Sequence, residues 1–176
     1  MFITNDIIIR KADLNDSNIL KEVAWKTQLE TFEKMNPPGL SLAYLHENMT
    51  IEIIENELVD LGSTYFLVEK NEKAIGYLKV RTDNIEENKL AGENCMELQR
   101  IYLLAAEKGN GYGKMLLNYA ENLAKSLYFD LLWLGVWEKN LPAIAFYKHH
   151  GYEFFGEHAF LYAGDVQNDF MMRKKL

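Results

Sequence analysis

The stretch CMELQRIYLLAAEKGNGYGK, residues 95–114, decides the fold of this 176-residue chain. Residues 96–104 are rich in apolar side chains, which is typical of a buried β-strand. Glycines then stand at every second position (Gly109, Gly111 and Gly113), and apolar residues recur at helical spacing after them. A glycine turn that opens a helix leaves backbone N–H groups unpaired, and the helix dipole adds partial positive charge. The stretch therefore predicts a strand, a glycine loop and a helix whose first turn can bind a phosphate or pyrophosphate.

Two common phosphate-binding loops do not fit this stretch. A Walker A loop needs Gly, four residues, Gly-Lys and then Ser or Thr. Here Gly113 and Lys114 are followed by Met115, and the residue five positions before Gly113 is Lys108. The dinucleotide fingerprint needs Gly-x-Gly-x-x-Gly near the start of a βαβ unit. This loop reads Gly-x-Gly-x-Gly and lies late in the chain, so neither assignment explains it.

The loop resembles the acetyl-CoA loop of the GCN5-related N-acetyltransferase (GNAT) family. That signature is Arg or Gln, two residues, Gly, one residue, and Gly or Ala, and Lys108, Gly111 and Gly113 meet it with Lys in the first place. Residues 137–152 are similar to the second half of such a domain, at the expected distance after the loop. The resemblance covers residues 63–176 well and implies an acetyl-CoA-dependent N-acetyltransferase. The residues that carry the second match are Asn140, Ala143, Phe146, Tyr147, Gly151 and Tyr152.

Three further segments narrow the resemblance within the family. Residues 76–79 (GYLK), 97–102 (ELQRIY) and 164–169 (GDVQND) are most similar to the PaiA-like bacterial polyamine N-acetyltransferases. This similarity implies that the acetyl acceptor is a primary amine of a small polycation such as spermidine or spermine. The alternatives are another amine, such as a protein N-terminus or an aminoglycoside, and a non-catalytic acetyl-CoA-binding module.

The whole chain predicts one mixed α/β domain over residues 1–176. A strand, a crossover helix and a second strand form a right-handed parallel unit around the glycine loop. The resemblance implies the GNAT fold, a central and mostly antiparallel sheet with one parallel β-α-β crossing and helices on both faces. We expect strands at 7–10, 64–69, 74–81, 96–104, 130–137, 152–161 and 168–173. We expect helices before the break at 36–39, from about 41, from 50 to about 61, after the glycine loop, and from 140 to 151.

Individual residues mark the ends of these elements. Gly135 inside the strand 130–137 indicates that a backbone or a ligand approaches closely. Small polar side chains can accept hydrogen bonds from the first N–H groups of a helix. The expected helix caps are Asn15 or Asp16, Ser41, Thr50 and Asn140.

The composition limits the compartment and the partners. The net charge of −7 argues against a nucleic-acid surface and favours cationic partners. No apolar run is long enough to span a membrane, no signal peptide is evident, and the single cysteine, Cys95, is compatible with a reducing compartment. We therefore expect a cytoplasmic enzyme with a small-molecule amine substrate, no nucleic-acid or membrane partner, and either a monomer or a homodimer. No metal is expected, because no set of ligand residues has metal-binding spacing.

Acetyl transfer requires that the acceptor ammonium, with a pKa of about 10, lose a proton, and a leaving thiolate benefits from a proton donor. The resemblance makes Tyr147 the candidate acid, with a core aromatic residue as the alternative. Glu97 is the candidate base, acting through water, because a carboxylate on a buried strand is unusual unless paired or functional. The alternative for Glu97 is an ion pair with Arg100 or Lys79. Direct transfer is favoured over a covalent intermediate on Cys95, which has no clear His partner.

The resemblance also implies which residues contact the cofactor and the acceptor. Backbone amides near residues 103–104 are implied to hold the pantetheine arm where the two parallel strands separate. Phe32 and Tyr44 could line a methylene chain or meet an ammonium group face-on, unless they are core anchors. The implied cofactor contacts are Ile101, Tyr102, Leu103, Lys108, Gly109, Asn110, Gly111, Tyr112, Gly113, Lys114, Asn140 and Tyr147. The expected acceptor contacts are Phe32, Tyr44, Glu97 and Trp137. The acids that could hold remote ammonium groups, or simply form an acidic surface, are Glu86, Glu87, Glu93, Asp165 and Asp169.

Overall fold

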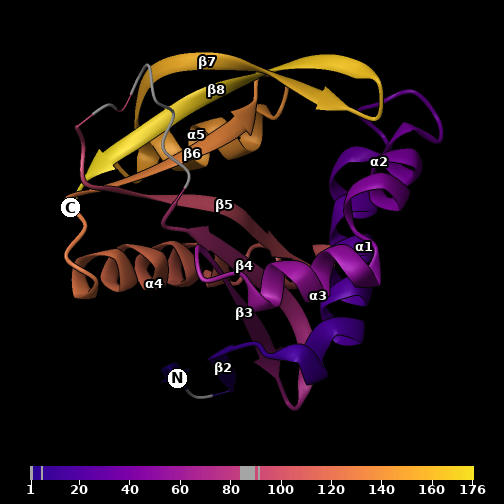
Figure 1. The fold of residues 1–176 in the computed structure, drawn as a ribbon, viewed down its shortest axis with the longest axis horizontal. Coiled ribbons are helices and arrows are strands. Elements are labelled where there is room, and N and C mark those ends of the chain that lie inside the picture. The colour runs from indigo at the N-terminus through magenta and orange to yellow at the C-terminus, as the bar shows by residue number, and fades with distance from the viewer. Residues whose placement is uncertain (1, 5, 84–89, 91) are drawn as a thin grey trace.

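The computed structural model describes residues 2–4, 6–83, 90 and 92–176, and one sheet organises them (Figure 1). The sheet has eight strands in the order β1-β2-β3-β4-β5-β6-β8-β7. All neighbouring strands are antiparallel except β5 and β6, which are parallel. The predicted mixed α/β fold with one parallel crossing is confirmed. The strands are β1 (Phe2–Thr4), β2 (Ile7–Lys11), β3 (Ser63–Lys70), β4 (Lys73–Arg81), β5 (Cys95–Leu103), β6 (Leu131–Trp137), β7 (Glu153–Tyr162) and β8 (Asp165–Lys175).

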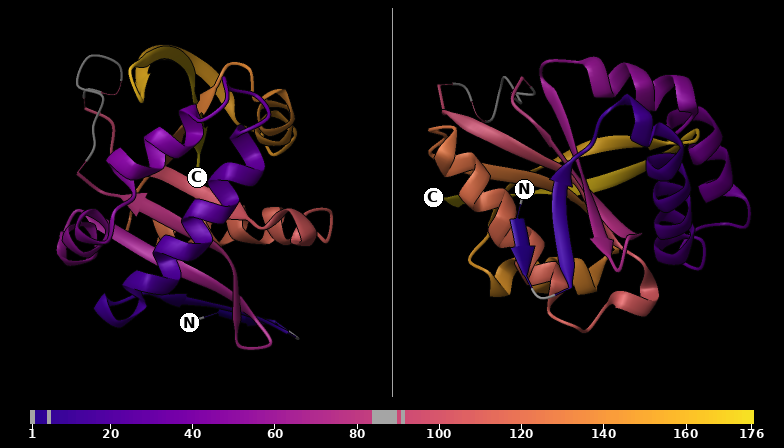
Figure 2. Two further views of the ribbon diagram at one scale, coloured as in Figure 1. Left: turned by 90° about the vertical axis from the view of Figure 1, so that its right-hand side faces the viewer. Right: turned by 90° about the horizontal axis from the view of Figure 1, so that it is seen from below.

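Helices cover both faces of this sheet, as expected. Figure 2 shows the strands passing between α1–α3 on one side and α4 and α5 on the other. Leu116 and Ala120 of α4 and Ile144 of α5 pack on one core, and Leu20 of α1 and Ile54 of α3 pack on the other. The helices are α1 (Ser17–Phe32), α2 (Leu40–Asn48), α3 (Ile51–Val59), α4 (Tyr112–Ser126) and α5 (Leu141–His149), with short 3₁₀ turns η1 (Leu14–Asp16) and η2 (Ala105–Glu107). Among the described residues, no helix combines the length and apolarity needed to cross a membrane.

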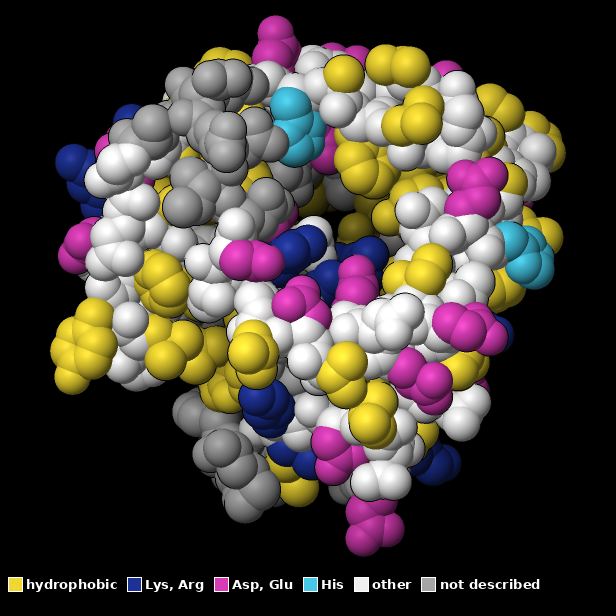
Figure 3. Space-filling model, in the orientation of Figure 1, with side chains coloured by type: hydrophobic (Ala, Val, Ile, Leu, Met, Phe, Trp, Pro, Cys, Tyr) yellow, Lys and Arg dark blue, Asp and Glu magenta, His cyan; other side chains and the backbone are white. Residues whose placement is uncertain are grey.

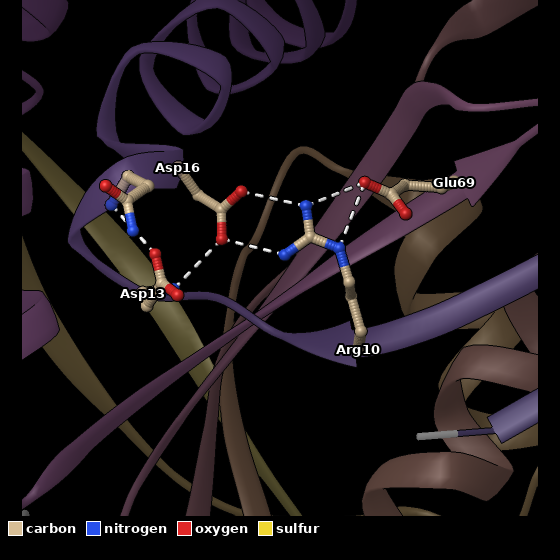
Figure 4. A network of polar contacts seen from close by, with 5 residues as sticks. Arg10, Asp13, Asp16 and Glu69 are labelled. Atoms are coloured by element: carbon tan, nitrogen blue, oxygen red, sulfur yellow. Dashed lines mark hydrogen bonds and ion pairs between the residues drawn. The ribbon is translucent and has the colours of Figure 1, made fainter.

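A charged network fixes the start of α1 against the sheet (Figure 4). The Arg10 guanidinium on β2 donates to both oxygens of Asp16 at 2.8 Å and to Glu69 on β3 at 2.8 Å. Asp16 also accepts from the backbone N–H of Asp13, and Asp13 in turn accepts from Asn15. Asp16 therefore occupies the N-cap position of α1, as expected, but without a side-chain cap. Asp13 caps the 3₁₀ turn η1, and Asp16 makes no side-chain cap of α1 because Arg10 and Asp13 occupy its carboxylate.

Two of the other expected caps are confirmed and one is wrong. Thr50 accepts from Ile53 at 3.3 Å at the start of α3, and Asn140 accepts from Ala143 at 3.4 Å at the start of α5. Ser41 is instead a buried residue inside α2. That helix begins at Gly39, whose φ of +82° suits glycine because it has no Cβ, and it follows the predicted break at 36–39.

The C-terminal hairpin is longer than the sequence indicated. Strand β7 ends at Tyr162 and β8 begins at Asp165, so the turn is Ala163 and Gly164 alone. Asp169 lies within β8, as the expected strand 168–173 placed it, and alternate side chains of this strand face opposite sides of the sheet. Strand β1 was not predicted. Glu86 and Glu87 of the predicted acidic connection lie outside the described residues.

The parallel pair β5 and β6 diverges along its length. Only Cys95, Met96 and Glu97 pair with β6, opposite Leu131–Trp133, and the strands separate beyond that point. On its other edge, β5 carries a bulge against β4: Lys79 pairs with Arg100 and Val80 with Leu98, which leaves Gln99 as the extra residue. A bulge increases local twist and bends a strand, so it helps β5 turn away from β6.

Candidate active site

A cavity of about 550 Å³ occupies the space where β5 and β6 separate. Its lining comes from α1, α2, β4, β5, β6, α5, β7 and β8, so segments from most of the chain meet there. Figure 3 shows one face of the molecule hollowed, with basic and acidic side chains gathered beside the opening. The cavity extends from Lys108 and Gly113 at the glycine loop to Tyr44 and Phe160 at α2 and β7. One cavity thus connects the expected cofactor loop with the expected acceptor wall.

The glycine loop has the geometry of an anion site. Gly109 and Gly111 have φ values of +83° and +81°, and a Cβ built on either would meet no atom within 4 Å. Gly111 is the N-cap of α4, and no side chain caps the helix. The N–H groups of the first turn of α4 are therefore available to a ligand, with the helix dipole behind them. This open backbone fits the pyrophosphate of coenzyme A.

The predicted cofactor residues fall into two groups. The first group lines the cavity: Ile101, Tyr102, Leu103, Lys108, Gly113, Asn140 and Tyr147. The second group forms the loop and the first turn of α4 outside the cavity wall: Gly109, Asn110, Gly111, Tyr112 and Lys114. The Lys108 ammonium donates to Thr31 at 3.4 Å, and the Tyr112 ring packs under the ammonium of Lys70, 5.5 Å from the ring centroid. The Lys108 contact joins the loop to the last turns of α1.

Helix α5 places Tyr147 in the cavity wall. Tyr147 is 8% exposed and contacts the rings of Phe146 and Tyr152. Burial raises the pKa of its hydroxyl well above the ordinary value, so the hydroxyl keeps its proton at neutral pH. Phe146 also lies 3.6 Å from the position a Cβ would take on Gly113. Packing between α5 and the glycine loop therefore holds Tyr147 near the start of α4.

The predicted acceptor residues Phe32, Tyr44 and Trp137 meet at the other end of the cavity. The Phe32 ring lies 6.2 Å from that of Trp137, and the Tyr44 ring stacks on that of Tyr162 at 4.4 Å. Phe160 also lines this wall. The sequence analysis missed Phe160 and Tyr162, although residues two positions apart on a strand share a face, so the two rings could have been grouped.

Glu97 lies in the cavity wall and is 7% exposed. It pairs in register with Arg81 of β4 and Trp133 of β6. Both cations named as its alternative partners contact another acid: Glu57 of α3 lies 2.6 Å from the Lys79 ammonium and 3.2 Å from the Arg100 guanidinium.

Glu57 forms the centre of a charged cluster under the cavity. Tyr65 donates to Glu57 and accepts from Arg100. Burial opposes ionisation of Glu57, but Arg100 and Lys79 outweigh it and hold its pKa below the usual range. Burial, with Arg100 nearby, lowers the pKa of Lys79 to about 8. Arg100 also lines the cavity, so the cluster presents one cation to a ligand.

Two further polar groups line the cavity: Gln99, which the sequence analysis missed, and Asp169, which it named among the acids that could hold an ammonium group. Gln99, at the bulge of β5, has a buried Oε1 that accepts no hydrogen bond from any described residue. Asp169 on β8 has a side chain 17% exposed, and its Oδ2 lies 3.9 Å from Nε2 of His158 on β7. Burial raises the pKa of Asp169 to about 6, against the opposing effect of His158. The acceptor end of the cavity therefore offers carboxylate and amide oxygens between aromatic rings.

A glycine loop at a helix start, a diverging parallel pair and a buried tyrosine on the next helix define an acyl-CoA-dependent transferase. A model of the Acetyltransferase (GNAT) family matches residues 26–152, which is more than half of the chain. The chain therefore belongs to the GNAT family and is an N-acetyltransferase that uses acetyl-CoA.

Relatives and solved structures agree with this family. The chain is 32% identical over 154 residues, 88% of each protein, to a Lactobacillus delbrueckii subsp. lactis protein named "Uncharacterized N-acetyltransferase in pepI 3'region". Its fold matches that of the PaiA N-acetyltransferase from Thermoplasma acidophilum in complex with coenzyme A, with a TM-score of 0.80, 24% identity, and 98% and 100% of the two chains covered. It also matches mutant forms of the spermidine/spermine N-acetyltransferase SpeG from Vibrio cholerae, with a TM-score of 0.68, 17% identity, and 98% and 95% covered. These two likenesses show a shared fold.

Proposed function

We propose that this N-acetyltransferase acetylates a primary amine of a linear polyamine such as spermidine or spermine. The observation that carries the proposal is the composition of the acceptor end of the cavity. Hydrogen-bond acceptors line this end: the carboxylates of Glu97 and Asp169, and Oε1 of Gln99, which has no partner among the described residues. An amine can donate hydrogen bonds to such groups. Phe32 and Tyr44 add ring faces that suit methylene groups and ammonium groups. The name of the SpeG protein, a spermidine/spermine N-acetyltransferase that shares the fold, favours the same acceptor class.

Charge around the cavity supports a cationic acceptor. Three carboxylates, those of Glu57, Glu97 and Asp169, lie in or under the acceptor end, against the two cations Lys79 and Arg100. The whole chain carries a formal charge of −7. Long-range attraction of this sign raises the encounter rate with a polycation.

The chain's own residues then have distinct roles. Acetyl-CoA, when bound, supplies the acetyl group as a thioester. The N–H groups of the first turn of α4, with Lys108, hold the phosphates of this cofactor, and residues 101–103 border the gap between β5 and β6. Glu97 receives, through water, the proton that the acceptor ammonium must lose. Tyr147 keeps its hydroxyl proton at neutral pH and donates a hydrogen bond toward the sulfur that leaves.

A peptide N-terminus is the second candidate acceptor, and Arg100 favours it. Its guanidinium lines the cavity and could donate to a peptide carbonyl oxygen, which a polyamine lacks. Arg100 already donates to Glu57 at 3.2 Å and to Tyr65 at 2.5 Å, which weakens this argument.

The salt dependence of catalysis tests the polyamine proposal. We expect kcat/KM for spermidine to fall as salt rises, because the Debye length shortens from about 10 Å at 0.1 M to about 3 Å at 1 M. Butylamine, with one charge, is the matched control and should respond less. A kcat/KM for spermidine that is as insensitive to salt as that for butylamine would contradict electrostatic recognition of the acceptor.

A further inference from the structure

Asp169 is a carboxylate in the cavity wall that takes no part in the proton transfers described above. It lies on β8, opposite Trp137 of β6 and His158 of β7. Most of its side chain is shielded from solvent, so an ionised carboxylate there is costly unless a cation meets it. His158 lies 3.9 Å away, beyond the range of a direct hydrogen bond.

Gly135 lies beside this carboxylate in the wall of the cavity. A Cβ built on Gly135 would lie 3.4 Å from Oδ2 of Asp169 and 3.7 Å from Nε2 of His158. A larger side chain at this position would fill the space over both groups, and Gly135 itself lines the cavity. The sequence predicted that some group approaches this glycine closely, and the side chains of Asp169 and His158 are those groups. Both side chains line the ligand cavity, as Gly135 does.

Glu97 and Asp169 flank Gly135 on the same face of the sheet. Glu97 pairs with Trp133 and Asp169 with Trp137, and alternate residues of β6 share a face. At about 3.3 Å per residue, the β6 positions opposite the two acids are roughly 13 Å apart. The two acids therefore lie at different points along the sheet, which a chain with two cationic groups can span.

We infer that Asp169 binds a second ammonium group of the acceptor in the space over Gly135, while Glu97 serves the amine that reacts. Asp169 is then a specificity-determining residue that favours diamines and longer polyamines over monoamines. This inference rests on the proposed polyamine function. It concerns binding alone, because the second ammonium keeps all its protons and no bond to it changes.

Matched amines test the role of Asp169. We would measure kcat/KM for spermidine and for butylamine in the parent and in Asp169→Asn, and calorimetric binding of spermidine to both proteins. Asp169→Asn should lower kcat/KM and affinity for spermidine about tenfold, the size of a lost charge-assisted hydrogen bond. Butylamine should change less than about twofold, because it has no second ammonium. Glu153→Gln, at an exposed acid of the same hairpin, is the control and should change neither.

A second variant tests the space rather than the charge. Gly135→Val keeps a residue that suits a strand and fills the room over Asp169, so it should cause the same selective loss for spermidine. An equal loss for both amines in Asp169→Asn would overturn the inference and leave the polyamine function standing. If the parent acetylates peptide N-termini and no polyamine, the proposed function fails and the inference fails with it.

Discussion

Replacing Asp169 by Asn should stabilise the ligand-free protein at neutral pH. Burial raises the pKa of Asp169 from the ordinary 3.8 to about 6. The folded state therefore binds this proton more tightly than the unfolded chain, and the ionised carboxylate costs stability above pH 6. The difference of about 2 pKa units, at 1.36 kcal/mol each, gives a cost of about 3 kcal/mol at pH 7. Since the Asn amide must also be buried, we expect a net gain of about 1–3 kcal/mol.

Thermal unfolding measured against pH tests this reasoning. For a chain of this size, 1 kcal/mol shifts Tm by about 2–4 °C, so Asp169→Asn should melt about 3–10 °C above the parent at pH 7.5. The gap should narrow as the pH falls from about 6 toward 3.8, because the folded parent takes up the Asp169 proton first and the unfolded chain follows only near its ordinary pKa of 3.8. Glu153→Gln, at an exposed acid, should melt with the parent throughout. A less stable Asp169→Asn protein at pH 7.5, or a gap that does not depend on pH, would refute the account.

The remaining predictions concern the cofactor loop and the acid. Gly111→Asp should abolish the rise in Tm that acetyl-CoA gives the parent, because it adds a negative charge at the start of α4. Gly111→Asn is the control: Asn tolerates the same φ of +81° without the charge, so this variant should keep part of the rise. Equal binding of acetyl-CoA by the parent and Gly111→Asp would show that the phosphates bind elsewhere. Tyr147→Phe should lower turnover about 10-fold to 1000-fold with acetyl-CoA affinity nearly unchanged, as for loss of general acid help. Tyr128→Phe, at an exposed ring, is its control, and full activity of Tyr147→Phe across the pH range would remove Tyr147 from the mechanism.

The sequence predicted the parts of the site that depend on local structure. The strand, glycine loop and helix over residues 95–126 follow from apolar periodicity and glycine alternation, and the structure has them. Thr50 and Asn140 cap their helices as expected, because a cap needs only residues within one turn. Ser41 had the right chemistry for a cap but lost that position to Gly39, whose positive φ cannot be read from capping preference alone.

Contacts between distant segments could not be predicted in the same way. Glu57 on α3 pairs with both Lys79 and Arg100, and nothing near Glu57 in the sequence points to strands β4 and β5. Asp169 was expected either to hold an ammonium group or to form an acidic surface, and only the packing of β8 against β6 and β7 shows that it lines the cavity. Gly135 was the sequence feature that pointed to this part of the cavity, because a glycine inside a strand predicts that some group approaches closely. It did not show that the approaching group is Asp169.

A competition experiment tests the central claim, that the acceptor is a polyamine. Spermidine, a peptide with a free N-terminus and an aminoglycoside would be mixed at equal concentration with limiting acetyl-CoA, and the acetylated products measured by mass spectrometry. The product ratios in such a mixture equal the ratios of kcat/KM, so transition-state binding is compared directly. We predict that acetylated spermidine exceeds each other product by at least about tenfold, or about 1.4 kcal/mol of discrimination. A mixture in which the peptide carries most of the acetyl groups would contradict the claim and leave the fold and the cofactor assignment unchanged.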